Sequence, residues 1–384
     1  MVINYNLKYL KYKTKYFELK NMIGGNPLFK PLTEVKIEGQ INSLSFNNIN
    51  GHLAIGTNTN TLIYNDYKLI KTLKKEKKDK TNCPVNHVSY SGTHLVTSCG
   101  KDAIVYEIGQ DYKEIIVCDG PSDKYCSSIM KMECAGASFE KLTIPICYNN
   151  QEVILWSPKV TFGIVNLLDI TNKVQLKIHG NEKIDLINSM SWKGERFATC
   201  SSSRVAIWND SKSLNVNTHP TTGSLIGKDF KLIAYIPHNY EGGDFMALVI
   251  NNNSNIIFYK CSDEFLTDNR KTPEFLIRTD HPIPKQYATS FDKSGITLLV
   301  FHPTKKYLAT CGTENKVNIW SFEEPDSEKA KQLKFLNKDY FKVIKTIQVD
   351  TSSIVTSIAF NNDDIAIGCN DGKLIVWQEF VLKK

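Results

Sequence analysis

The sequence predicts an all-β fold, a seven-bladed β-propeller of four-stranded antiparallel blades, with a short N-terminal amphipathic helix. Three observations predict it. A three-part unit recurs along the 384 residues, each part has the length and composition of a β-strand, and four of the five tryptophans occupy one position of the unit. Many short strands joined by turns are typical of a propeller, in which each repeat forms one blade.

The first strand of each unit places apolar residues at relative positions 0, 3 and 5. A regular strand, whose side chains alternate between two faces, would place them at 0, 2 and 4. The pattern therefore predicts a β-bulge that shifts the register by one residue. Five segments carry it: INSLSF (41–46), VNHVSY (85–90), INSMSW (187–192), ITLLVF (296–301) and VTSIAF (355–360).

The second and third strands follow across links rich in Gly, Asn, Asp and Ser, which favour hairpin turns. The second strand is rich in small residues: HLAIGT (52–57), HLVTSC (94–99), RFATCS (196–201), YLATCG (307–312) and DIAIGC (364–369). The third strand ends in an aromatic residue. Two weaker units, one from about Ser128 to VILWS (153–157) and one from KLIAYIP (231–237) to IIFYK (256–260), bring the closing aromatics to seven: Tyr64, Tyr106, Trp156, Trp208, Tyr259, Trp320 and Trp377.

A fourth strand follows the closing aromatic at a variable distance, as in YKLIKTL (67–73), EFLIRT (274–279) and FKVIKTI (341–347). The seventh unit has no such segment after Trp377, while LTEVKIEG (32–39) precedes the first unit without a partner. We expect residues 32–39 to complete the last blade, because this closes the ring and removes an exposed sheet edge.

Over roughly residues 31–384 these units resemble the WD-repeat family. The resemblance implies a propeller that binds other proteins and holds no cofactor. The sequence departs from the family pattern because no closing aromatic is directly followed by Asp and the family's Gly-His pair is absent. Asp102 and Asp371 match the family's turn aspartate, and the resemblance implies that they hydrogen-bond turn amides and fix the hairpin.

Composition and motifs give no support to a catalytic or metal site. None of the ten cysteines forms a CxxC pair, and GxSxG, Walker A, GxGxxG and HExxH motifs are absent. Five cysteines stand at the end of second strands, at positions that lie far apart around a ring. We expect these to be small buried thiols that pack as apolar groups: Cys99, Cys147, Cys200, Cys311 and Cys369.

The net charge of +7 is concentrated in two short segments. Residues 1–25 and residues 71–80 each carry +4, which leaves −1 for the rest of the chain. A broad basic face for a phosphate backbone is therefore disfavoured. The lysine-rich link between the first two blades remains a candidate surface for an acidic or phosphorylated partner, through Lys74, Lys75, Lys77, Lys78 and Lys80.

The N-terminal 25 residues predict a basic amphipathic leader helix that ends at Gly24 and Gly25. Its apolar face, with a 4-3-4-3 spacing, consists of Tyr5, Tyr9, Tyr12, Tyr16 and Leu19. The stretch YLKYKTKYFELKNMIGG (9–25) resembles a leader that recurs on otherwise unrelated proteins of giant cytoplasmic DNA viruses. This resemblance implies viral origin and a sorting or processing signal, with cleavage after Gly25 as the candidate event.

Three classes of function follow from these observations. The leading hypothesis is a non-catalytic interaction scaffold, with residues 1–25 as leader and residues 26–384 as propeller, in the host cytoplasm or a virion. The alternatives are a nucleic-acid-associated factor that uses the lysine-rich link and the leader, and a propeller enzyme with a site in the central channel. No apolar run is long enough to cross a bilayer and no secretory signal is present, so we expect the chain not to be secreted.

Overall fold

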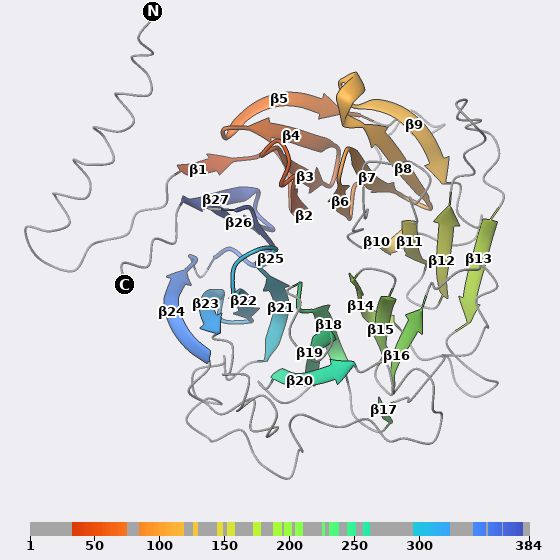
Figure 1. Cartoon of the computed structure of the whole chain (residues 1–384). Helices are drawn as coiled ribbons and strands as arrows, with labels where there is room; N and C mark the ends of the chain where they lie inside the picture. The colour runs from red at the N-terminus through yellow and green to blue at the C-terminus, as the bar shows by residue number, and fades with distance from the viewer. Residues whose placement is uncertain are drawn as a thin grey trace, which may run out of the picture.

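The computed structural model of the chain describes residues 33–74, 84–118, 126–129, 144–148, 152–157, 172–177, 187–193, 196–201, 204–209, 225–226, 230–237, 244–250, 256–261, 295–322, 341–350, 352–362 and 364–378. These residues form seven antiparallel sheets, six with four strands and one with three. We number them blades 1 to 7 in chain order. Figure 1 shows the sheets following one another around a ring, with the first strand of each nearest the middle.

Each blade is built from strands that are consecutive in the chain, apart from the outer strand of blade 7. The inner strands are β2 (Ile41–Phe46), β6 (Val88–Ser91), β10 (Cys126–Ile129), β14 (Ile187–Lys193), β18 (Phe230–Tyr235), β21 (Ile296–Phe301) and β25 (Val355–Phe360). The second strands are β3 (Leu53–Thr57), β7 (His94–Cys99), β11 (Ile144–Tyr148), β15 (Arg196–Ser201), β19 (Asp244–Ile250), β22 (Tyr307–Gly312) and β26 (Asp364–Cys369).

The third strands are β4 (Thr61–Asn65), β8 (Asp102–Glu107), β12 (Glu152–Ser157), β16 (Arg204–Asn209), β20 (Ile256–Cys261), β23 (Lys316–Phe322) and β27 (Lys373–Gln378). The outer strands are β5 (Lys68–Leu73), β9 (Lys113–Cys118), β13 (Asn172–Lys177), β17 (Leu225–Ile226), β24 (Phe341–Gln348) and, for blade 7, β1 (Thr33–Lys36). One short 3-10 helix, η1 (Ile108–Gln110), precedes β9. The prediction of an all-β fold with four-stranded antiparallel sheets is confirmed, and the predicted leader helix lies outside the described residues.

The predicted bulge in the inner strand is present in six blades. The register of β2 against β3 shifts between Ile41 and Ser43, and β10, β14, β18, β21 and β25 shift at the same place. Blade 2 differs, because the hydroxyl of Ser98 accepts hydrogen bonds from the backbone N–H groups of Asn86 (3.0 Å) and His87 (2.9 Å). The backbone N–H of Ser98 still donates to the carbonyl of His87 at 2.9 Å, but the regular strand β6 begins at Val88 rather than at residue 85.

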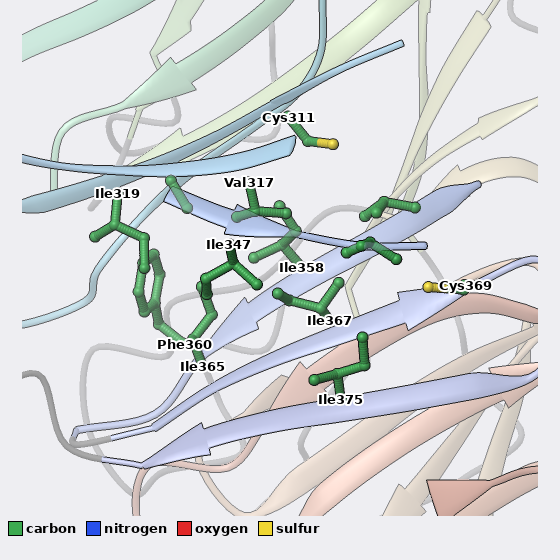
Figure 2. Close-up of a cluster of buried hydrophobic side chains, with 13 residues drawn as sticks. Cys311, Val317, Ile319, Ile347, Ile358, Phe360, Ile365, Ile367, Cys369 and Ile375 are labelled. Carbon is green, nitrogen blue, oxygen red and sulfur yellow. The ribbon is translucent and has the colours of Figure 1, made fainter. Parts of the chain in front are cut away.

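Neighbouring blades pack through apolar side chains that fill the boundary between them. The boundary of blades 6 and 7 buries isoleucines from both sheets, among them Ile319 and Ile367, each 0% exposed, around Phe360 (Figure 2). Similar clusters occupy the boundaries of blades 5 and 6, 1 and 2, and 7 and 1. Burial of apolar surface between sheets therefore supplies the main attraction that holds the ring together.

Serine hydroxyls add polar cross-links between inner strands. Ser357 of blade 7 accepts a hydrogen bond from the backbone N–H of Leu44 at 2.9 Å, across the boundary with blade 1. Ser45 accepts from Tyr90 of blade 2 at 3.0 Å in the same way. The serines that follow the bulge thus connect one blade to the next, where the inner strands lie closest.

The N-terminal strand β1 is the outer strand of blade 7. It pairs antiparallel with β27, from Thr33 opposite Val376 to Lys36 opposite Lys373. Directly after β1, the backbone N–H of Ile37 donates to the carbonyl of Gly372 at 2.8 Å. The two ends of the repeat region are therefore joined in one sheet, shown at the left of Figure 1.

The cysteines show one agreement and one correction. Cys147, Cys200, Cys311 and Cys369 are free and buried, as expected, and burial raises the pKa of Cys369 to about 11. Cys99 is disulfide-bonded, so its prediction as a free thiol is wrong. The spacing argument excluded bonds between equivalent repeat positions only, whereas half of the ten cysteines lie elsewhere in the repeats.

Candidate interaction surface

The residues predicted to bind partners fall mostly outside the described residues. Lys74 is described: it follows β5 and is exposed. Lys75, Lys77, Lys78 and Lys80 lie outside the described residues, as do the leader face and the Gly24-Gly25 pair. Their roles remain predictions.

One face of the ring is built from the links between blades and the turns between second and third strands; we call it the link face. The links are hydrogen-bonded to these turns or to the strands beside them. Val85 donates to the carbonyl of Thr57 at 2.8 Å, Val349 to Asn315 at 3.1 Å, and Asn370 to Ile354 at 2.9 Å. Main-chain hydrogen bonds therefore fix the backbone of these links, from which the side chains of this face project.

Blade 7 carries a cluster of charges at the link face. Lys373 bridges Asp350 (2.9 Å) and Glu34 (3.2 Å), and Lys36 donates to the carbonyl of Asp371 at 2.6 Å. The two lysines tie β1 to β27 and to the link before β25. These pairs are solvent-accessible, so their main effect is to orient the charges rather than to stabilise the fold.

Asp371 performs the role that the sequence predicted. Its Oδ1 accepts a hydrogen bond from the backbone N–H of Lys373 at 3.0 Å, which fixes the turn between β26 and β27. Its Oδ2 accepts from the hydroxyl of buried Ser353 at 3.0 Å. Partial burial raises the pKa of Asp371, but these hydrogen bonds and the charge of Lys36 outweigh it and hold the pKa below its ordinary value.

An exposed isoleucine lies beside this charge cluster. Ile354 is 58% exposed, although its backbone is fixed by two hydrogen bonds with Asn370, one of them from its own N–H to the side-chain oxygen at 2.8 Å. We call Ile354 and the charged residues around it the blade 7 patch; these are Glu34, Lys36, Asp350, Asp371 and Lys373. The patch thus combines an exposed apolar side chain on a fixed backbone with oriented charges around it, a composition that is common at protein-binding surfaces.

The opposite face contains polar contacts that the sequence analysis missed. In blade 1 the hydroxyl of Tyr67 donates to Oδ2 of Asp364 in blade 7. In blade 2 the hydroxyl of Tyr112 lies 2.6 Å from Nδ1 of His52 in blade 1. Both tyrosines follow an aspartate in the turn between third and fourth strands. The repeated Asp-Tyr-Lys at 66–68 and 111–113 was the signal in the sequence.

Among the described residues no group of three or more His, Cys, Asp and Glu side chains is placed to hold a metal ion. No helix in this part of the chain is long and apolar enough to span a membrane. His302, one of the buried histidines, uses both ring nitrogens within the fold: Nδ1 accepts from the backbone of Lys305 at 2.8 Å, and Nε2 lies 3.2 Å from the carbonyl of Asn362.

Comparison with known proteins agrees with this architecture. The family model for the WD domain, G-beta repeat (WD40), matches residues 285–321 and 341–378, in blades 6 and 7. A probable cytosolic iron-sulfur protein assembly protein 1 from Cryptococcus neoformans var. neoformans serotype D, strain JEC21, is 30% identical over 83 residues, which is 21% of this chain and 19% of that relative. The same protein from strain B-3501A matches equally. The match thus spans about a fifth of these relatives.

A chain in the crystal structure of a mitotic checkpoint complex has a similar fold, with a TM-score of 0.61 and 13% sequence identity. The match covers 92% of this chain and 96% of the other. At this level of identity the likeness concerns the fold alone, and it extends over nearly the whole length of both chains. Two segments in blades 6 and 7 therefore match the WD domain, G-beta repeat model, and the ring of antiparallel sheets has a fold shared over nearly its whole length with a chain of that complex.

Proposed function

We propose that the chain is a non-catalytic scaffold that brings other proteins together. The observation that carries this proposal is the blade 7 patch, where Ile354 is 58% exposed on a backbone fixed by hydrogen bonds. Rigid exposed anchors lose little conformational entropy when a partner binds, and a few such residues supply most of the binding energy.

The lysine-rich link forms the second part of the proposal. It leaves blade 1 at exposed Lys74 and returns at the start of blade 2 on the link face. Six lysines within residues 71–80 favour an acidic or phosphorylated partner. The leader resemblance supports viral origin and a place of action in the host cytoplasm or the virion.

Affinity purification with matched variants tests the patch. Ile354→Lys places a charge in the blade 7 patch, and Ile49→Lys places the same charge on the opposite face, where Ile49 is 73% exposed. We expect the first variant to lose at least one co-purifying protein by about tenfold or more, because a central anchor is worth over 1 kcal/mol. The Ile49→Lys variant should co-purify with the same proteins as the wild type. If the same proteins co-purify with the wild type and with both variants, the blade 7 patch is not a binding surface.

A charge variant tests the link. Changing Lys74, Lys75, Lys77 and Lys78 to Gln should weaken binding of acidic partners and reduce its salt dependence, with unfolding unchanged, because solvated charges add little stability. Nuclease treatment of the purified material distinguishes a protein scaffold from the alternative, a nucleic-acid-associated factor. If partners depart after nuclease digestion, the chain is a nucleic-acid-associated factor instead.

A further inference from the structure

The two Asp-Tyr turns adopt a backbone that residues with side chains rarely adopt. Asp66 and Tyr67 have φ values of 46° and 61°, and Asp111 and Tyr112 have 53° and 58°. Among the described residues only Asn315 shares this left-handed conformation without being glycine. Such conformations are unfavourable and persist only where other contacts hold them. At Asp66 and Tyr67 the two-residue hairpin between paired Asn65 and Lys68 requires this backbone, and the contacts of both tyrosine side chains add to what holds these turns.

Each tyrosine reaches back to the same position of the preceding blade. In blade 7, Asp364 directly precedes Ile365, which pairs with the closing aromatic Trp377. In blade 1, His52 directly precedes Leu53, which pairs with the closing aromatic Tyr64. Tyr67 bonds to Asp364 across the boundary of blades 7 and 1, and Tyr112 bonds to His52 across the boundary of blades 1 and 2. Blade 1 is therefore held on both sides by the same kind of contact, which we call a tyrosine latch.

The second latch continues into the core of blade 2. The hydroxyl of Tyr112 lies 2.8 Å from that of Tyr90, which is 3% exposed. Each hydrogen has an acceptor when Tyr90 donates to Tyr112 and Tyr112 donates to Nδ1 of neutral His52. The surrounding titratable groups are Asp66 of blade 1 and the pair of Lys71 with Asp111, whose Nζ and Oδ2 lie 2.6 Å apart.

Protonation of His52 disrupts this arrangement. Nδ1 then carries a hydrogen and becomes a donor to the Tyr112 hydroxyl, so the hydrogen of Tyr112 loses Nδ1 as its acceptor. Within the group of His52, Tyr112 and Tyr90, one hydroxyl hydrogen is then left without an acceptor, and an unmade hydrogen bond at a buried site is unfavourable. The first latch has a carboxylate as acceptor, and carboxylic acids ordinarily titrate well below histidine.

We propose that the Tyr112–His52 latch is an acid-sensitive joint, so that mild acid loosens the ring at the boundary of blades 1 and 2 while the Tyr67–Asp364 latch holds. Partial burial lowers the pKa of His52, and the charge of Asp66 opposes this shift in part. The folded chain thus binds the His52 proton less tightly than the unfolded chain. The latch contributes its full stability above the ordinary histidine pKa of 6.5 and loses it as the pH falls.

Two double-mutant cycles on the full chain test the proposal. The first combines Tyr112→Phe with His52→Gln, and the matched control combines Tyr67→Phe with Asp364→Asn. Urea unfolding at pH 7.5 should show a coupling of about fivefold in the unfolding equilibrium constant for each pair. At pH 5.5 the coupling factor between Tyr112 and His52 should fall close to one, which means no coupling. The coupling factor between Tyr67 and Asp364 should stay at about fivefold. Equal couplings of the first pair at the two pH values overturn the proposal.

A measurement on the wild-type chain covers the case in which a variant does not fold. Exchange of the imidazole C2 hydrogen for deuterium, followed by mass spectrometry, reports the pKa of each histidine in the folded protein. We expect a pKa for His52 below 6.5. A value at or above 6.5 would mean that acid stabilises the folded chain at this site, which contradicts an acid-sensitive joint.

Discussion

The closing aromatics differ in how their polar atoms are satisfied. The indole N–H of Trp320 donates to the hydroxyl of Thr310 at 3.0 Å, and both side chains are buried. In blade 7 the equivalent of Thr310 is Ile367, which offers no acceptor. The buried indole nitrogen of Trp377 accordingly has no hydrogen-bond partner among the described residues. Instead, the Nζ atom of Lys345 lies over the face of the Trp377 ring, 4.0 Å from its centroid, which is a cation–π contact.

Thr310 therefore gives a prediction. Thr310→Val keeps the shape of the side chain but leaves the indole N–H of Trp320 unpaired in a site that is 1% exposed. We expect a loss of about 1–3 kcal/mol in the free energy of unfolding. Thr310→Ser retains the hydroxyl and should cost less. Urea denaturation measures both, and a Val variant as stable as the Ser variant would contradict the assigned role of the hydroxyl.

Small residues recur where one blade meets the next inner strand. In five blades the residue opposite the third position of the inner strand is Gly56, Cys147, Cys200, Cys311 or Gly368, whereas blade 5 has Val249 there. A Cβ atom on Gly368 would lie 2.5 Å from Cγ2 of Ile41, a fully buried residue of blade 1. Three of the ten cysteines thus occupy this position, where a small apolar side chain fits beside the neighbouring blade.

Gly368→Ala should destabilise the chain by about 1–3 kcal/mol, because overpacking forces strand shifts at the boundary of blades 7 and 1. Gly109→Ala is the matched control, since nothing lies within 4 Å of its added Cβ. We expect the control to change stability by less than about 0.5 kcal/mol. Thermal unfolding of the two variants side by side decides whether the close approach of the blades is responsible.

At the scale of elements, many strands could be predicted because the spacing of apolar residues within each repeat reflects which side chains of a strand are buried. The positions of β2, β7, β15, β22 and β26 and the bulge follow from where apolar residues must face neighbouring blades. The start of β6 could not be predicted, because the side-chain hydroxyl of Ser98 accepts from the backbone N–H groups of Asn86 and His87. The tyrosine latches were missed for a similar reason: they connect different blades, and the pattern within one blade does not show them.

The strand β1 gives a prediction at this scale. Removal of residues 1–25 leaves β1 in place, whereas removal of residues 1–40 deletes its four pairs with β27 and buried Ile37. We expect the longer truncation to lose at least about 3 kcal/mol of stability and to aggregate through the exposed edge of β27. The shorter one should melt like the full chain. Matching melting curves for the two truncations would show that β1 is dispensable.

At the scale of the whole molecule, the leader stays a prediction that protein chemistry can test. Proteases of the type that process ubiquitin-like proteins accept a double glycine, and relatives of these proteases act on precursors in some large DNA viruses. Cleavage between Gly25 and Asn26 would release the basic leader and keep β1. Mass spectrometry of the protein from purified particles should then find a mature N-terminus at Asn26. An N-terminus at Met1 or Val2 in those particles would rule out processing.

The pairing of β1 with β27 also fixes when the molecule can be completed. Lys36 and its partner Asp371 are 335 residues apart in the sequence. At typical translation rates the ribosome needs about 17–67 s to travel that distance. Throughout this interval β1 is already made, but the strand that it pairs with does not yet exist. The last blade can therefore be assembled only after β27 has been made, and until then the nascent chain carries a β-strand without its partner.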